Sequence, residues 1–88
     1  MIYTVEFTES AKKDLKKLDT YTQKIILLWL NKNLQGCENP KAHGKLLSAN
    51  RAGEWRYRIG DYRIIALIEN NKLIILVIAI GHRKDIYK

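Results

Sequence analysis

Residues 55–65 carry the strongest chemical signal in this chain, because basic side chains recur there at a strand-like spacing around Gly60-Asp61. Side chains alternate between the two faces of a β-strand, so Arg56 and Arg58 share one face. A two-residue turn at Gly60-Asp61 places Arg58 opposite Arg63. Like charges directly opposite each other destabilise a sheet. The pattern therefore predicts an anion site, and the planar donor fork of arginine suits phosphate.

A second group of polar residues closes the chain, directly after its last apolar run. The strand formed by that run exits near the turn that carries Arg63. His82, Arg83 and Tyr87 are therefore predicted to converge on the arginines. The chain has no paired carboxylates of the glycosidase type, no metal-ligand spacing and no glycine-rich nucleotide loop. We expect no metal ion and no cofactor.

This set of residues suits cleavage of RNA without a metal. Arginines can stabilise the charge that develops on the phosphate, where each well-placed donor is typically worth about 100- to 1,000-fold. Arginine is a poor base, so His82, with a reference pKa of about 6.5, is the candidate for proton transfer, and Tyr87 can assist. The predicted catalytic residues are Arg58, Arg63, His82, Arg83 and Tyr87, and the predicted RNA contacts are Lys45, Arg51, Arg56 and Lys84.

Simpler interpretations of the same residues stay open. Arg56 and Arg58 would also suit the solvated face of an edge strand, and His82 and Tyr87 would also suit an ordinary surface tail. His43 stands apart from other ligand-type residues, so it is not expected to bind metal.

The composition describes a small basic protein. With 88 residues, 16 Lys and Arg, 9 Asp and Glu and a formal net charge of +7, the chain is predicted to form one domain over residues 1–88 and to bind nucleic acid or an acidic partner. Cys37 is the only cysteine, so a reducing, cytoplasmic location is expected. The apolar runs 25–30 and 73–80 are shorter than the roughly 20 residues that cross a bilayer, so no membrane contact is expected.

Hydrophobic periodicity predicts a strand over residues 2–7 followed by two helices. Thr8 is placed to cap the first helix, which ends near residue 19. Thr20 and Gln23 form a capping-box pattern that starts a second helix, running to about residue 34. The second helix is apolar around most of its circumference, so we expect it to be covered on more than one side, by the sheet and the first helix or by a partner.

The second half of the chain predicts strands near residues 54–59, 62–69 and 72–80, after a basic loop over 36–53 with a short strand near 45–48. A two-residue turn at Asn70-Asn71 sets Glu69 opposite Lys72, a favourable pair. The last two strands are apolar on both faces. Two helices can cover one face of the sheet, so another protein is expected to cover part of the other.

The predicted fold is α+β in the order β-α-α-β-β-β. An αα-hairpin packs on one face of a largely antiparallel sheet, and the first strand joins the sheet beside the last.

The chain resembles the RelE toxins of bacterial and archaeal toxin–antitoxin pairs over nearly its whole length. The resemblance is carried by residues 3–7, 11–15 and 45–47, and most specifically by 55–65 and 82–87. It implies a toxin that enters the ribosomal A site of the 70S ribosome and cuts the mRNA codon there, as a metal-independent endoribonuclease. It also implies a cognate antitoxin that wraps around the toxin, with operator DNA contacted only through the antitoxin.

In the RelE family, active basic residues match Arg56, Arg58, Arg63 and Arg83, and a tyrosine matches Tyr87. The best-studied enterobacterial member has lysines where this chain has Arg56 and Arg58, which shifts the expected proton transfer toward His82. Two alternatives stay open: a ParE-like inhibitor of DNA gyrase, which shares the fold, and a non-catalytic basic module that binds nucleic acid or acts as a co-repressor.

Overall fold

The computed structural model describes residues 1–46 and 53–86. Within these ranges five strands form one sheet in the order β1-β5-β4-β3-β2, with β1 parallel to β5 and the other neighbours antiparallel. This confirms the predicted α+β fold and the place of the first strand beside the last. The elements are β1 (Thr4–Phe7), α1 (Glu9–Lys16), α2 (Thr20–Asn33), the 3₁₀ turn η1 (Pro40–His43), β2 (Lys45–Leu46), β3 (Glu54–Ile59), β4 (Tyr62–Glu69) and β5 (Ile74–His82).

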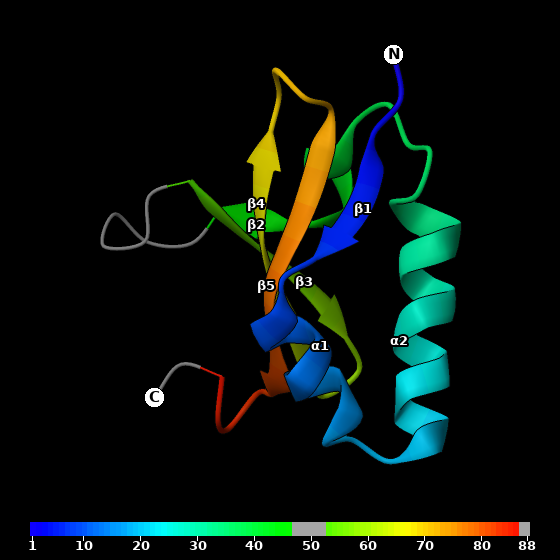
Figure 1. Ribbon diagram of the computed structural model, residues 1–88, viewed down its shortest axis with the longest axis vertical. Coiled ribbons are helices and arrows are strands. Elements are labelled where there is room, and N and C mark those ends of the chain that lie inside the picture. The colour runs from blue at the N-terminus through cyan, green and yellow to red at the C-terminus, as the bar shows by residue number, and fades with distance from the viewer. Residues whose placement is uncertain (47–52, 87–88) are drawn as a thin grey trace.

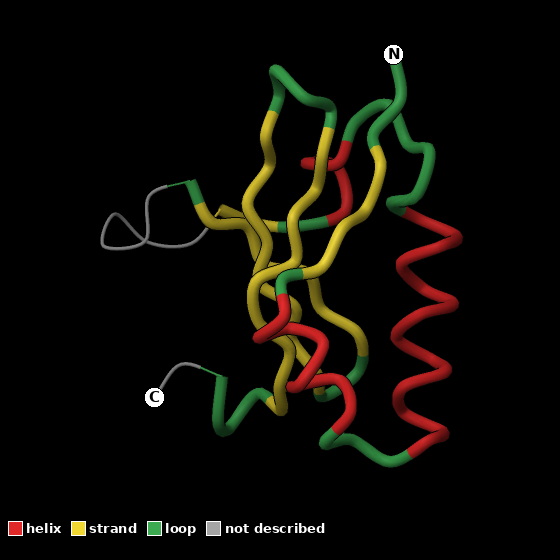
Figure 2. The backbone as a smooth tube through the Cα atoms, viewed as in Figure 1, coloured by secondary structure: helices red, strands yellow, loops and turns green. Residues whose placement is uncertain are grey.

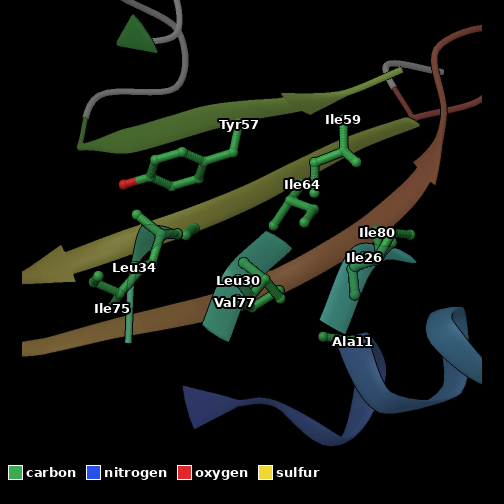
Figure 3. Packing of buried hydrophobic residues seen from close by; sticks show 11 residues of the cluster. Ala11, Ile26, Leu30, Leu34, Tyr57, Ile59, Ile64, Ile75, Val77 and Ile80 are labelled. Atoms are coloured by element: carbon green, nitrogen blue, oxygen red, sulfur yellow. The ribbon is translucent and has the colours of Figure 1, made fainter. Parts of the chain in front are cut away.

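Both helices pack against the same face of the sheet. Figure 1 shows α2 running along one side of the strands, with the C-terminal turn on the other side, and Figure 2 shows the helices and strands in the same view. Ala11 of α1 and Ile26 and Leu30 of α2 meet the side chains of the sheet in one core cluster (Figure 3). The sheet face away from the helices is therefore left for other contacts.

The two helix starts follow local capping, but only one was predicted correctly. The Oγ1 atom of Thr8 accepts a hydrogen bond from the N–H of Ala11 at 3.1 Å, as expected for the cap of α1. The cap of α2 is Asp19, whose carboxylate accepts from the N–H and the hydroxyl of Thr22 at 3.0 and 2.6 Å. The hydroxyl bond and then the N–H bond lower the pKa of Asp19. The Thr20–Gln23 capping box is wrong because Asp19 is the better N-cap.

The turn between β3 and β4 has the predicted geometry. Arg58 lies opposite Arg63 and Ile59 lies opposite Tyr62, which leaves two residues in the turn. Gly60 has a φ of +58°, a conformation that costs a residue with a Cβ but not glycine.

The turn between β4 and β5 is longer than predicted. Glu69 lies opposite Ile74, so residues 70–73 form the connection and the predicted Glu69–Lys72 pair is wrong. The N–H of Lys72 donates to the carbonyl of Glu69 at 3.2 Å, and the hydroxyl of Tyr3 donates to Asn70 at 2.8 Å. These hydrogen bonds stabilise a four-residue connection in place of a tight turn.

An irregularity in the β4–β5 ladder changes the pairing of the β5 residues that follow Ile78. Ala66 pairs with Val77 but Ile65 pairs with Ala79, so Ile78 is an extra residue in β5. A β-bulge of this kind reverses which face the following residues occupy. Ile80 therefore joins the core that faces the helices.

The core is closed at one end by η1. Tyr57 is fully buried, and its hydroxyl donates a 2.8 Å hydrogen bond to the carbonyl of Pro40. Burial raises the pKa of Tyr57, which keeps the hydroxyl protonated as a donor. A Cβ at Gly44 would lie 2.7 Å from the carbonyl oxygen of Arg56, so only glycine lets η1 approach β3 this closely.

Large apolar side chains on α2 are exposed to solvent. Tyr21 is 73% exposed, Leu28 is 61% exposed and Leu27 is 43% exposed. On the sheet face away from the helices, Ile65 is buried. The sheet and α1 leave these side chains of α2 exposed, so of the two covers expected for α2 a partner remains. In the described ranges, no helix has the length and apolar content to span a bilayer.

The carboxylate of Asp14 on α1 accepts a 3.1 Å hydrogen bond from the backbone N–H of Ile80. This N–H lies beyond the part of β5 that pairs with β1, so the side chain replaces a missing strand partner. We expect Asp14→Ala to lower the free energy of unfolding by about 1–2 kcal/mol, because the N–H loses its acceptor. Asp14→Asn retains an acceptor oxygen and serves as the control in thermal unfolding. Equal melting temperatures for Asp14→Ala and the unmodified protein would contradict the interpretation.

Candidate functional site

Four basic residues share the sheet face away from the helices. Lys45 of β2 lies opposite Arg56 of β3, and Arg58 lies opposite Arg63 of β4. Arg56 and Arg58 are two residues apart on one strand, so their side chains leave the same face. We call Lys45, Arg56, Arg58 and Arg63 the arginine face. The Cβ atoms of these residues stand about 7 Å apart along β3 and about 5 Å apart between strands, as strand geometry requires.

Arg63 is the most constrained of these residues. It is 8% exposed, and its Nη1 atom donates to the carbonyls of Gly60 and Tyr62 at 2.9 and 3.0 Å. Carbonyl acceptors orient a guanidinium without cancelling its charge. Arg63 thus presents a fixed positive charge beside the turn, whereas Arg58 is exposed to solvent.

The end of β5 lies beside the same turn. The N–H of Arg83 donates to the carbonyl of Asp61 at 2.8 Å, and its Nε atom lies 3.8 Å from a carboxylate oxygen of Asp61. Gly81 lies directly opposite Arg63. The chain therefore brings Arg83 to the turn that carries Arg63, as the sequence suggested.

His82 does not share the arginine face. It lies opposite Tyr62, and the two rings meet edge to face with centroids 5.5 Å apart. Tyr62 packs against the core, so the His82 ring lies on the helix side of the sheet end. The bulge at Ile78 causes this correction, because one extra residue sends position 82 to the opposite face. Its Nδ1 atom accepts a 3.2 Å hydrogen bond from the N–H of Lys84.

A hollow of about 240 Å³ borders the arginine face at the outer edge of β3. His43 reaches this hollow because η1, an element that the sequence does not predict, brings it beside β3. Lys45 is a predicted RNA contact, and its pairing with Arg56 comes from the structure. The ring of His43 also lies edge-on to Trp29 of α2, with centroids 6.4 Å apart. The hollow is lined by Ala42, His43, Gly44, Lys45, Arg56 and Arg58.

The remaining predicted site residues fall into two groups. Lys84 is exposed on the turn that follows β5. Arg51 and Tyr87 lie outside the described residues. Across the part of the chain that the structure describes, no three His, Cys, Asp or Glu side chains gather as a metal site would require.

Comparison with known proteins assigns this chain to a family. Residues 5–87 match the model of the ParE toxin of type II toxin–antitoxin systems. The chain is 32% identical to Toxin RelG of Mycobacterium tuberculosis over 88 residues, covering 100% of this chain and 99% of the relative. It is also 32% identical to a putative RelE-like toxin protein of Escherichia coli over 90 residues, covering 99% of this chain and 92% of the relative.

A solved structure shows the same arrangement. The toxin–antitoxin complex RelBE2 from Mycobacterium tuberculosis contains a chain that superposes with a TM-score of 0.85 at 30% identity, covering 97% of each chain. The sheet order, the helix pair and the sequence match agree with one another. The chain therefore belongs to the RelE/ParE superfamily and is the toxin of a type II toxin–antitoxin system.

Proposed function

We propose that this toxin is a ribosome-dependent endoribonuclease that cuts mRNA in the A site. The observation that carries the proposal is the direct pairing of Arg58 with Arg63 on a face shared with Lys45 and Arg56. Two arginines held side by side repel each other unless an anion lies between them. A ribose phosphate is an anion that both guanidinium groups can grip through paired hydrogen bonds.

The reaction is an internal transfer at phosphorus. The ribose 2′ oxygen attacks the adjacent phosphorus and the bond from phosphorus to the 5′ oxygen breaks. The proton leaves the 2′ oxygen and another is delivered to the departing 5′ oxygen, leaving a 2′,3′-cyclic phosphate and a 5′ hydroxyl. Arg58, Arg63 and Arg83 stabilise the negative charge that grows on the phosphoryl oxygens. Lys45, Arg51, Arg56 and Lys84 hold the neighbouring phosphates.

Proton transfer falls to His82 in this proposal, with Tyr87 assisting. The Nδ1 atom of His82 accepts from Lys84, so in the neutral ring Nε2 carries the proton and is the nitrogen that faces away from this bond. His82 is half-buried at the end of β5, next to Arg83 of the site. The His82 ring lies on the opposite sheet face from Arg63, so it would reach the phosphate past the end of β5.

A second candidate function is inhibition of DNA gyrase. The family model that matches residues 5–87 bears the ParE name, and that branch shares the fold. The two functions differ in what an induced cell shows: cut mRNA and arrested translation, or DNA damage with intact mRNA. Primer extension on mRNA after induction separates them directly. A non-catalytic basic module would give neither result.

The partner of the toxin is proposed to be a cognate antitoxin, in line with the RelBE2 complex of its structural neighbour. The exposed apolar residues of α2 favour binding of a partner that removes them from water. Leu28, Ile25 and Trp29 line a hollow of about 480 Å³ on this helix. The helix has lysines and no acidic residue. An apolar segment with acidic flanks fits such a surface.

For the arginines, we expect Arg58→Gln and Arg63→Gln each to lower kcat for mRNA cleavage on programmed ribosomes by about 100- to 1,000-fold. Arg58 is exposed, so its variant keeps the melting temperature, which separates chemistry from folding. Lys24→Gln, on the exposed side of α2, is the charge-matched control. Equal cleavage by all of these proteins would refute the site.

For proton transfer, we expect His82→Gln to lower kcat for mRNA cleavage on programmed ribosomes by about 100-fold or more. Glutamine keeps hydrogen-bonding capacity but cannot act as a general acid or base. Cleavage at the unmodified rate would remove His82 from the mechanism.

For the partner surface, we expect Leu28→Lys to weaken binding of the cognate antitoxin at least about tenfold while leaving thermal stability unchanged, because Leu28 is 61% exposed in the free toxin. Isothermal titration with the purified antitoxin measures the change. Lys12→Gln on α1 is the control. Unchanged affinity for Leu28→Lys would show that the antitoxin leaves this part of α2 uncovered.

A further inference from the structure

The C-terminal turn folds back onto the arginine face through a single apolar side chain. Ile86 packs over Gly81, so closely that a Cβ at position 81 would lie 3.2 Å from Cδ1 of Ile86 and 3.7 Å from its Cβ. A distance of 3.2 Å is tighter than ordinary van der Waals contact. The absence of a side chain at Gly81 is therefore what gives Ile86 its place.

Backbone hydrogen bonds close the same turn on His82. The N–H groups of Asp85 and Ile86 donate to the carbonyl of His82 at 2.9 and 3.0 Å. The N–H of Lys84 donates to the ring of His82 at 3.2 Å. These hydrogen bonds restrict the backbone between positions 82 and 86 and hold Ile86 near Gly81.

This packing places an apolar group next to Arg63. Gly81 lies directly opposite Arg63, and side chains at opposed positions are about 5 Å apart at their Cβ atoms. Ile86 occupies the space that a side chain at position 81 would fill, and Arg63 is 8% exposed. Water excluded beside a guanidinium lowers the local dielectric and strengthens its action on a nearby anion.

The same packing fixes the chain on both sides of Arg83. On one side, the N–H of Arg83 is held by the carbonyl of Asp61 at 2.8 Å. On the other, three residues later, Ile86 is held against Gly81. The backbone of Arg83 is therefore constrained before and after its side chain, which limits where its guanidinium can reach.

We propose that Ile86 is a positioning residue for the phosphate site, acting through Arg63 and Arg83 by packing on Gly81. The proposal rests on the proposed cleavage of RNA. Ile86 itself touches no reacting atom in this scheme. Its contribution is to fix the orientation of Arg63 and Arg83. A displacement of either cation by up to about an ångström weakens a preorganised site.

The test is single-turnover cleavage of mRNA on programmed ribosomes. Ile86→Ala is expected to lower kcat about tenfold to a hundredfold, with KM for the programmed ribosome within twofold of the unmodified value. Ile86→Leu keeps an apolar side chain and is expected to restore most of the rate. Ile2→Ala near the N-terminus removes the same atoms from a residue 59% exposed and is expected to leave cleavage unchanged.

A double-mutant cycle distinguishes positioning from a general loss of structure. Because Ile86 is proposed to act through Arg63 and Arg83, Ile86→Ala is expected to lower the rate of an Arg63→Gln/Arg83→Gln protein by less than about twofold. Full additivity would overturn the inference, as would unchanged kcat for Ile86→Ala. Amide exchange at Asp85 and Ile86 provides a readout without catalysis, because loss of the packing speeds exchange there. If the unmodified protein cuts no mRNA, the proposed function falls first, whereas normal cleavage by Ile86→Ala overturns the positioning role alone.

Discussion

One extra residue in β5 decides what each side of this sheet can do. The bulge at Ile78 turns Ile80 toward the helices, where it joins the core, and turns Gly81 toward the arginine face. Without that residue His82 would share a face with Arg63. The bulge thus separates the imidazole from the guanidinium groups and leaves a glycine opposite Arg63, into whose space the C-terminal turn can fold.

The sequence predicts the arginine pairing and not the bulge, for a physical reason. Alternation over β3 is unambiguous because Arg58 falls between aromatic and apolar neighbours, and Gly60-Asp61 marks the turn. In β5 nearly every residue is apolar, so the alternation of apolar and polar residues that would identify the core face is missing. The connection over 70–73 and the Asp19 cap were missed because tertiary hydrogen bonds and a better neighbouring cap outweigh the local pattern.

The molecule carries two unlike surfaces on opposite sides. The arginine face is cationic, and the backbone register sets which of its residues lie opposite each other. The outer side of α2 is apolar around Leu28, and apolar side chains exposed to water there do not stabilise the free domain. The proposed function gives each surface a role: the arginine face binds the target, and the outer side of α2 binds the antitoxin.

The parallel pairing of β1 with β5 has a consequence for biosynthesis. β1 holds residues 4–7 and its neighbour begins at residue 74, so the first strand emerges from the ribosome long before a strand exists for it to pair with. Contacts this distant in sequence form late in folding. A nascent chain interrupted before β5 lacks the strand between β1 and β4 as well as Arg83, and cannot assemble the sheet. Assembly of the complete sheet therefore requires translation through β5.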